Sequence, residues 1–175
     1  MKPRMGRAPN LQAALSAVSL KVRRALEASH EALRLAGVPH ALIGGLAVGA
    51  HGYVRATRDV DWLVGDEAYR FVGKLVVMRE GVPYEYDGVK IDYLSPAAEG
   101  EKAVLSKGAA ISIAPVEHLV RQKLGAGRAK DQADVIELCK RGADERSILA
   151  YLRSAAPHLI PEFDRLASRA RKEAP

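Results

Sequence analysis

Three aspartates have the spacing of ligands for a divalent cation. Asp59 and Asp61 stand two residues apart at the start of an apolar run, and Asp92 lies in the alternating run at residues 89–94. Both runs predict β-strands, and side chains two apart on a strand share a face, so Asp59 and Asp61 are expected roughly 6.6 Å apart along one strand face. Asp92 by itself would be a solvent-facing acid on a strand edge. Together the three carboxylates predict a site for divalent cations.

A pair of glycines, Gly44 and Gly45, ends a short apolar run at residues 41–43. This break lets the backbone turn tightly and approach a ligand, and a helical turn expected at residues 46–50 would direct N–H groups at an anion. The P-loop and the dinucleotide-binding fingerprint do not fit, because the chain lacks the lysine of the first and the G-x-G-x-x-G spacing of the second. Thr57 and Arg58 directly precede the first acid. The combination predicts a phosphate site beside a cation site.

The composition and net charge of the chain indicate which kinds of molecule it could bind. The chain has 175 residues, of which 48% are hydrophobic and 27% charged, as in ordinary globular proteins, and its net charge is +6. A positive balance favours a polyanionic partner, either a nucleic acid or a nucleoside triphosphate. The aromatic content of 5% argues against a platform that stacks the bases of a single strand.

Cysteine use and hydropathy indicate where the protein works. The single cysteine, Cys139, cannot form a disulfide within the chain, which fits a reducing cytoplasm. The longest uncharged apolar run, residues 41–50, is too short to span a bilayer, so no membrane association is expected. The five histidines have neither an H-E-x-x-H motif nor a zinc-ligand spacing.

The order of predicted elements indicates an α/β (α+β) fold with a mixed, mostly antiparallel sheet flanked by helices. Apolar residues spaced by three and four from Leu11 to Ala36 predict one long N-terminal helix. A short helix is expected at residues 67–75. Asp87 and Gly88 predict a hairpin turn that leads into the strand with Asp92.

Helices are expected to dominate the last third of the chain. Lys123 falls on the apolar face of a helix predicted at residues 115–124, so its amine is expected to reach into a cleft. After a glycine break, Asp131 is expected to cap the next helix, with Asp134 in its first turn. We therefore predict a core at residues 1–114 with a helical segment at residues 115–175 packed on it.

The set of motifs resembles the nucleotidyltransferase superfamily that includes DNA polymerase β. The resemblance is carried by Gly44-Gly45, the string R-A-T-R-D-V-D that ends at Asp61, Asp92 in a later strand, and the run K-L-G-A-G-R-A-K-D-Q-A-D that begins at Lys123. These matches look closest to small bacterial members: abortive-infection-type toxins, minimal nucleotidyltransferases of toxin–antitoxin pairs and aminoglycoside nucleotidyltransferases. They span roughly residues 41–138. One departure is Gly45, where many polymerase-type members carry serine.

The resemblance implies an activity and a set of roles. It implies a nucleotidyltransferase sheet and a Mg²⁺-dependent transfer of a nucleoside monophosphate from a nucleoside triphosphate to an acceptor hydroxyl on RNA, a protein or a small molecule. Asp59, Asp61 and Asp92 would be catalytic and would hold two Mg²⁺ ions, with Mn²⁺ as an alternative. The nucleotide would be bound by Gly44, Gly45, Thr57, Arg58 and Lys123. Positive net charge favours tRNA or another RNA over a cationic aminoglycoside as the acceptor.

Two other functions stay open from the sequence. The chain could use the same fold without turnover, as a binding module or an antitoxin-like partner of a cognate toxin. A purely RNA-binding role rests on net charge alone.

Overall fold

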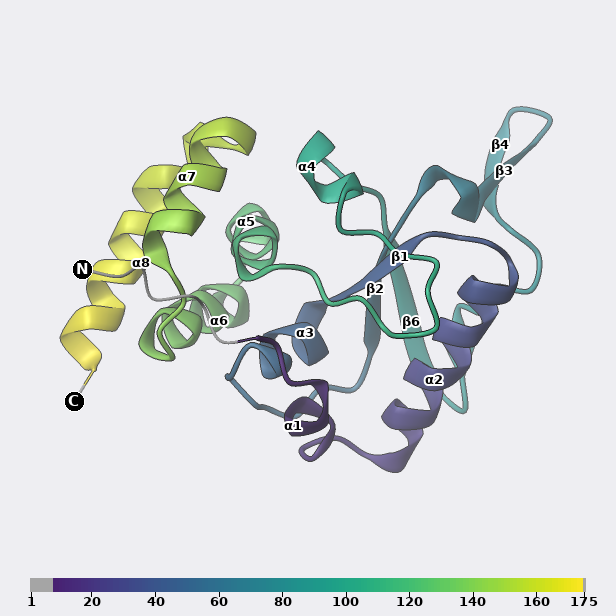
Figure 1. Cartoon of the computed structure of the whole chain (residues 1–175), viewed down its shortest axis with the longest axis horizontal. Helices are drawn as coiled ribbons and strands as arrows, with labels where there is room; N and C mark the ends of the chain where they lie inside the picture. The colour runs from purple at the N-terminus through teal and green to yellow at the C-terminus, as the bar shows by residue number, and fades with distance from the viewer. Residues whose placement is uncertain (1–7, 175) are drawn as a thin grey trace.

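The computed structural model describes residues 8–174 and has a mixed α/β fold (Figure 1). Its α-helices are α1 (Leu11–Leu15), α2 (Leu20–Leu35), α3 (Gly44–Ala50), α4 (Glu99–Lys102), α5 (Val116–Ala126), α6 (Ala129–Lys140), α7 (Glu145–Ala155) and α8 (Ile160–Glu173). Short 3₁₀ turns are η1 (Asp66–Ala68) and η2 (Pro157–Leu159). The strands are β1 (His40–Ile43), β2 (Val60–Val64), β3 (Tyr69–Val72), β4 (Leu75–Met78), β5 (Glu85–Tyr86) and β6 (Val89–Leu94). The predicted α/β class is confirmed.

The main sheet has four strands in the order β1-β2-β6-β5. β1 is antiparallel to β2, β2 is parallel to β6, and β6 is antiparallel to β5, so the sheet is mixed and mostly antiparallel as predicted. The hairpin between β5 and β6 turns at Asp87 and Gly88, whose φ angles of 50° and 77° are those that a two-residue turn of this kind requires. The parallel register of β2 and β6 sets Asp61 opposite Asp92.

Helix α2 covers one face of this sheet, as the contacts of α2 with β2, β5 and β6 show. Trp62 of β2 points to this face: it is fully buried, and its indole Nε1–H donates to Ser29 Oγ of α2 at 2.9 Å. Because successive side chains on a strand point to opposite faces, Asp61 points to the other face. The packing of Trp62 on α2 therefore fixes the direction of the carboxylate beside it.

Two histidines join α2, β1 and the segment that precedes α5. His30 Nδ1 lies 2.7 Å from His40 Nε2, and the other ring nitrogens face the Ala109 carbonyl at 3.0 Å and the Val38 carbonyl at 2.8 Å. Burial lowers the pKa of His40. These contacts hold the segment at residues 106–114 against the sheet, where it also makes a β-bridge to Leu42 through Ile113.

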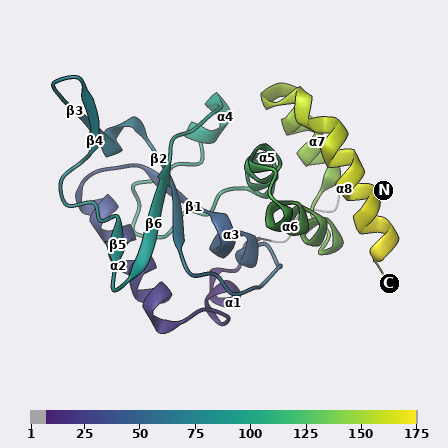
Figure 2. The ribbon, with the colours of Figure 1, turned by 180° about the vertical axis from the view of Figure 1, so that it is seen from behind.

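Helices α5 to α8 form a group on the side of the molecule opposite α2 (Figure 2). α5 and α6 are joined by a sharp turn at Gly127, whose φ is +64°, and α8 packs along α6. The predicted boundary at residue 114 falls just before α5. Across residues 8–174, every helix is too short or too polar to cross a bilayer.

The predicted long N-terminal helix is wrong, because the structure has two helices, α1 and α2, in its place. Ser16 Oγ donates to the Ala13 carbonyl at 2.7 Å, and Ser19 Oγ caps α2 by accepting from Val22 N–H at 3.3 Å. Serine favours such contacts with nearby backbone over a continuous helix. The apolar stripe nevertheless continues across the break through Val18.

The helix predicted at residues 67–75 is also wrong. Those residues form η1, β3 and the start of β4, and β3 and β4 pair as a separate antiparallel hairpin that turns at Gly73 with φ of +61°. β-Branched and aromatic side chains favour extended backbone here. The hairpin extends away from the main sheet (Figure 1).

Candidate functional site

The structure brings Asp59, Asp61 and Asp92 together on the sheet face opposite α2. Asp61 and Asp92 are register partners on the parallel strands β2 and β6, and Asp59 immediately precedes β2. One carboxylate oxygen from each residue lies within 4.8 Å of the others. Asp59 and Asp61 therefore lie close together as their spacing predicts, and Asp92 of the neighbouring strand joins them.

Burial and the neighbouring acids both raise the pKa of Asp61. Burial, followed by the charges of Asp59 and Asp92, raises the pKa of Asp61 to about 6, against an opposing effect of Lys123 and Lys130. The carboxyl group of Asp61 therefore carries a proton more readily than an ordinary aspartate. A bound cation would relieve the same repulsion that the proton relieves.

Lys90 is the cation that contacts this cluster directly. Its Nζ lies 2.6 Å from Asp92 Oδ1 and 2.9 Å from Oδ2, and its side chain is 72% exposed. An exposed lysine on a flexible stem is easily displaced, since surface ion pairs contribute little stability. Lys90 therefore forms an ion pair with Asp92 that a metal ion can displace.

The acids open into a cavity of about 310 Å³. Its described lining joins the sheet edge to the α5–α6 turn and consists of Ile43, Gly44, Gly45, Arg55, Thr57, Asp59, Asp61, Asp92, Tyr93, Leu94, Gln122, Lys123, Ala126, Arg128, Lys130 and Asp131. Three of its acids stand on the sheet side, whereas the α5–α6 side supplies three basic residues and Asp131. A cavity with this distribution fits a ligand that brings both cations and anionic groups.

The glycines make room for the acids. Gly44 has φ of +68°, and a Cβ at this position would lie 1.9 Å from Asp61 Oδ2. At Gly45 a Cβ would lie 2.9 Å from Thr57 Oγ1, and that hydroxyl donates to Asp59 Oδ1 at 2.8 Å. Thr57 thus orients Asp59, and the two glycines allow Asp61 and Thr57 to approach the backbone. The phosphate-binding role predicted for these glycines stays a prediction.

Lys123 reaches the cavity, as its place on α5 predicts, but it is already paired. Its side chain is buried, and Nζ lies 2.9 Å from Asp131 Oδ1 and 2.9 Å from Asp134 Oδ2. Both aspartates lie on α6, which the turn at Gly127 folds back beside α5. The predicted caps are therefore wrong: α6 begins at Ala129, and the two carboxylates bind the lysine.

Two arginines extend this pairing. Arg55 donates from Nε and Nη2 to the two carboxylate oxygens of Asp134, each at 2.8 Å, and Arg128 Nε donates to Asp131 Oδ2 at 2.6 Å. The hydrogen bonds that Arg55 donates to Asp134 raise the pKa of Arg55. The contact between Arg55 and Asp134 joins the loop before β2 to α6, so this network fixes the helical wall of the cavity against the acid-bearing strand.

Sequence reasoning missed Arg55, Arg128 and Lys130 as cavity residues. The signal for Arg128 was its position three residues before Asp131, a spacing at which opposite charges meet on a helix. Arg55 carried no such signal, since its partner lies 79 residues away. The predicted Arg58 is exposed and is absent from the described lining of the cavity.

The oxygen donors fit Mg²⁺ or Mn²⁺ in kind and in spacing. Magnesium binds oxygen ligands at about 2.0–2.1 Å, and paired catalytic metals stand about 3.5–4 Å apart, so carboxylate oxygens within 4.8 Å suit such a pair. Zinc sites use mainly histidine and cysteine, which this cluster lacks.

Comparison with known proteins gives no family: the chain matches no protein-family model and no curated protein. What the site does is therefore inferred from its geometry and chemistry.

Proposed function

We propose that this protein is a metal-dependent nucleotidyltransferase that moves a nucleoside monophosphate from a nucleoside triphosphate to an acceptor hydroxyl. The observation that carries the proposal is the convergence of Asp59, Asp61 and Asp92 from two parallel strands into one cavity. A cavity that sets three converging acids beside basic residues suits a triphosphate that arrives with its divalent cations. The mixed sheet, the Gly44 turn and the resemblance in sequence motifs all agree with a nucleotidyltransferase fold.

Asp59, Asp61 and Asp92 would hold the two Mg²⁺ ions. Bound there, the metal would polarise the α-phosphoryl group and make the acceptor hydroxyl a better nucleophile. Thr57 keeps the Asp59 carboxylate oriented through its hydrogen bond. Asp92, whose side chain is 35% exposed, is placed to accept the proton of an incoming hydroxyl.

The bond changes of the transfer are simple. The acceptor oxygen forms a bond to the α-phosphorus, the bond from this phosphorus to the α–β bridging oxygen breaks, and pyrophosphate leaves. Lys130 lines the cavity and would neutralise charge that develops on the leaving pyrophosphate, whereas Arg128 is paired with Asp131. Lys123, which is paired with Asp131 and Asp134, would hold α5 and α6 together beside the acids.

RNA, tRNA included, is the acceptor class that we propose, because the net charge of +6 attracts polyanions and repels cationic aminoglycosides. A nucleotidyltransferase of this size that modifies RNA would also suit the toxin of a toxin–antitoxin or abortive-infection pair, with a cognate protein to restrain it.

A second function, nucleotide binding without turnover, has one observation in its favour. Lys123 and Arg55, two of the basic residues in the cavity, are already neutralised by Asp131 and Asp134. A chain of this kind would bind Mg²⁺ and nucleoside triphosphate, and its melting temperature would rise with both, yet it would transfer nothing.

Labelled nucleotides distinguish these functions. The protein is incubated with Mg²⁺, total RNA and nucleoside triphosphates that carry ³²P at either the α or the γ position. Nucleotidyl transfer puts the α label and none of the γ label on RNA, and Asp61→Asn abolishes it, whereas Asp164→Asn, which removes an exposed acid of α8, does not. Transfer of the γ label, or equal labelling by wild type and Asp61→Asn, would contradict the proposal. A thermal shift without labelling would favour the binding module.

A further inference from the structure

The hairpin of β3 and β4 exposes the most apolar surface of the described chain. Four side chains at its outer end are largely exposed: Phe71 at 79%, Leu75 at 67%, Val76 at 59% and Val72 at 50%. The register pairs Phe71 with Val76 and Val72 with Leu75, and successive pairs point to opposite faces, so both faces of the outer end are apolar. Figure 1 and Figure 2 both show this hairpin extending from the body, away from α5–α8. Exposed apolar surface of this kind indicates a binding surface.

The hairpin is fixed at its base and open along its sides. Arg79 N–H donates to the Ala68 carbonyl at 2.7 Å, and Ser95 Oγ donates to Tyr69 Oη at 3.2 Å, which ties the base to the end of β6. Within residues 8–174, β4 pairs with β3 alone, so its other edge keeps unpaired backbone N–H and C=O groups. A strand edge with free backbone groups can accept another strand.

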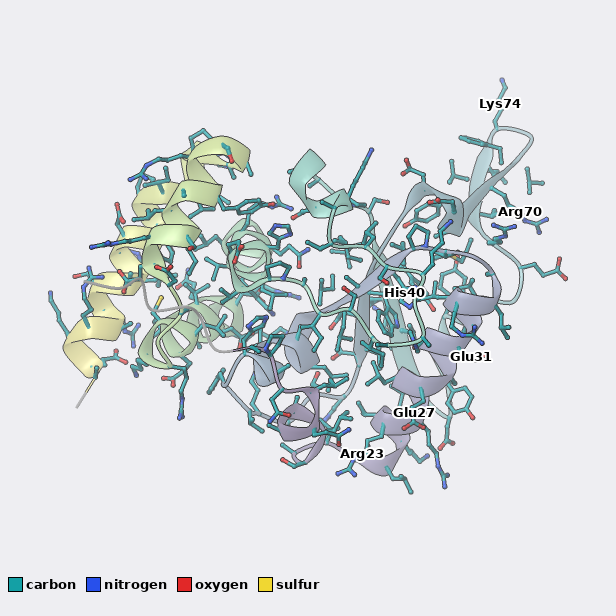
Figure 3. All side chains as sticks on the ribbon, in the orientation of Figure 1. Arg23, Glu27, Glu31, His40, Arg70 and Lys74 are labelled. Atoms are coloured by element: carbon teal, nitrogen blue, oxygen red, sulfur yellow. The ribbon has the colours of Figure 1, made fainter. Side chains whose placement is uncertain are left out.

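Strand β4 itself, Leu75–Met78, carries no charge along this edge. A charged residue within the strand is one way in which natural edge strands prevent pairing. In this chain the charges stand at the two ends instead: Lys74 precedes β4 and Arg79 follows it. Both are exposed, and neither takes part in an ion pair among the residues that the structure describes. Lys74 points away from the body at the tip of the hairpin (Figure 3).

The end charges argue against a second copy of this chain as the occupant. An antiparallel pair of β4 strands centred between Val76 and Val77 would set Lys74 of each copy opposite Arg79 of the other. A parallel pair would set like residues side by side. Like charges directly opposite destabilise a strand pair. The same charges attract a strand that carries acids at both ends.

We propose that the free edge of β4 binds an extended segment of a partner protein that has four apolar or β-branched residues between two acids, spaced i and i+5. The segment would add a strand to the hairpin through main-chain hydrogen bonds, and its acids would pair with Lys74 and Arg79. Five residues of extended chain span about 17 Å, so acids five residues apart would lie near the two ends of the four-residue strand β4. Single-stranded RNA fits less well, because it cannot satisfy a row of backbone donors and acceptors.

Two fluorescein-labelled peptides test this proposal on the full chain: Glu-Val-Thr-Val-Thr-Glu and Lys-Val-Thr-Val-Thr-Lys. Fluorescence anisotropy should show that the wild type binds the acidic peptide at least about tenfold more tightly than the basic one, since two favourable charge pairs become repulsive. Lys74→Glu/Arg79→Glu should reverse this preference. Lys172→Glu/Arg153→Glu, with the same change in net charge on the distant helices α8 and α7, should keep the wild-type preference.

Hydrogen exchange locates the bound peptide. Amides of residues 75–78 should exchange more slowly with the acidic peptide present, and circular dichroism should show that all variants stay folded. Equal affinity for the two peptides, or protection elsewhere without protection of β4, would overturn the proposal. A wild-type dimer in sedimentation whose formation protects β4 would assign the edge to a second copy instead. Protection of β4 by an RNA oligonucleotide, with none by the acidic peptide, would assign it to RNA.

Discussion

Trp62 and Asp61 are neighbours on β2 and point to opposite faces of the sheet. The polar groups on the two faces differ in whether they have hydrogen-bonding or charged partners within the protein. On the α2 face the indole N–H meets Ser29, and the His30 and His40 rings lie beside a fully buried Trp62. On the other face three carboxylates lie within 4.8 Å of one another. The first arrangement is complete without a ligand, whereas the second is unfavourable until a proton or a cation joins it.

This difference teaches where stability and function reside in one strand. Packing on the α2 face stabilises the sheet and fixes the direction of Asp61, and the carboxylate cluster costs folding free energy at neutral pH. Groups that destabilise a fold in this way are typical of binding and catalytic sites. Substitutions on the two faces should therefore change stability in opposite directions.

The largest effect is expected on the α2 face. Trp62→Ala removes a fully buried indole and leaves a cavity, so the free energy of unfolding should fall by about 3–5 kcal/mol in urea denaturation. Leu35→Ala, on the exposed side of α2 at 74% exposure, should change it by under about 0.5 kcal/mol. Equal effects of the two substitutions would contradict the role given to the α2 face.

Asp61→Asn should stabilise the metal-free protein at pH 8. The folded-state pKa of Asp61, about 6, lies above the ordinary aspartate value of 3.8, so the folded chain holds this proton more tightly than the unfolded chain. Stability from this group is present at low pH and is lost as the pH rises from about 4 to 6. Asparagine avoids that loss, which amounts to at most about 3 kcal/mol.

Urea denaturation at pH 8 and pH 4 checks this expectation, with Asp164→Asn as the control. The gain from Asp61→Asn should shrink towards zero at pH 4, where the wild-type group is protonated. Millimolar Mg²⁺ should stabilise the wild type and not Asp61→Asn at pH 8. If Asp61→Asn destabilises the metal-free protein at pH 8, the negative charge of Asp61 is already compensated by groups of the protein, and the expectation is wrong.

Gly44→Ala should affect both stability and metal binding. Its left-handed backbone costs an alanine about 1–2 kcal/mol, and the new methyl group would displace the Asp61 carboxylate. Gly37→Ala is the matched control, because Gly37 also has φ of +68° but has no atom within 4 Å of the added Cβ. Both variants should lose similar backbone stability, and Gly44→Ala alone should bind Mn²⁺ more weakly. Unchanged Mn²⁺ affinity in Gly44→Ala would show that the glycine does not serve the cluster.

The smallest effect is expected from the exposed lysine on the cluster. Lys90→Met removes a cation that competes for Asp92, so Mn²⁺ affinity should rise by about two- to fivefold, because a surface ion pair competes only weakly. Lys21→Met removes a comparable exposed pair with Asp87 and should leave Mn²⁺ affinity unchanged. A fall in affinity for Lys90→Met would mean that the lysine supports the bound ion.

The parts of the site that follow from local rules could be predicted from the sequence. Because side chains alternate along β2, Asp61 and Trp62 point to opposite faces of the sheet. The turn at Asp87 and Gly88 forms the hairpin whose second strand carries Asp92. The neutralisation of Lys123 could not be predicted, because it depends on the angle at which Gly127 folds α6 back onto α5. The β3–β4 hairpin could not be predicted either, because its apolar residues are those expected of a buried helix or strand, whereas in the structure they are exposed.

Mn²⁺ binding in the presence of a non-hydrolysable nucleoside triphosphate tests the central claim most directly. Electron paramagnetic resonance of free Mn²⁺ counts the ions that each chain takes up. Wild type and Asp164→Asn should bind two ions per chain, and Asp59→Asn/Asp61→Asn should bind no ion beyond those that the free nucleotide holds. Equal uptake by the double variant and the wild type would show that the three aspartates do not form a metal site.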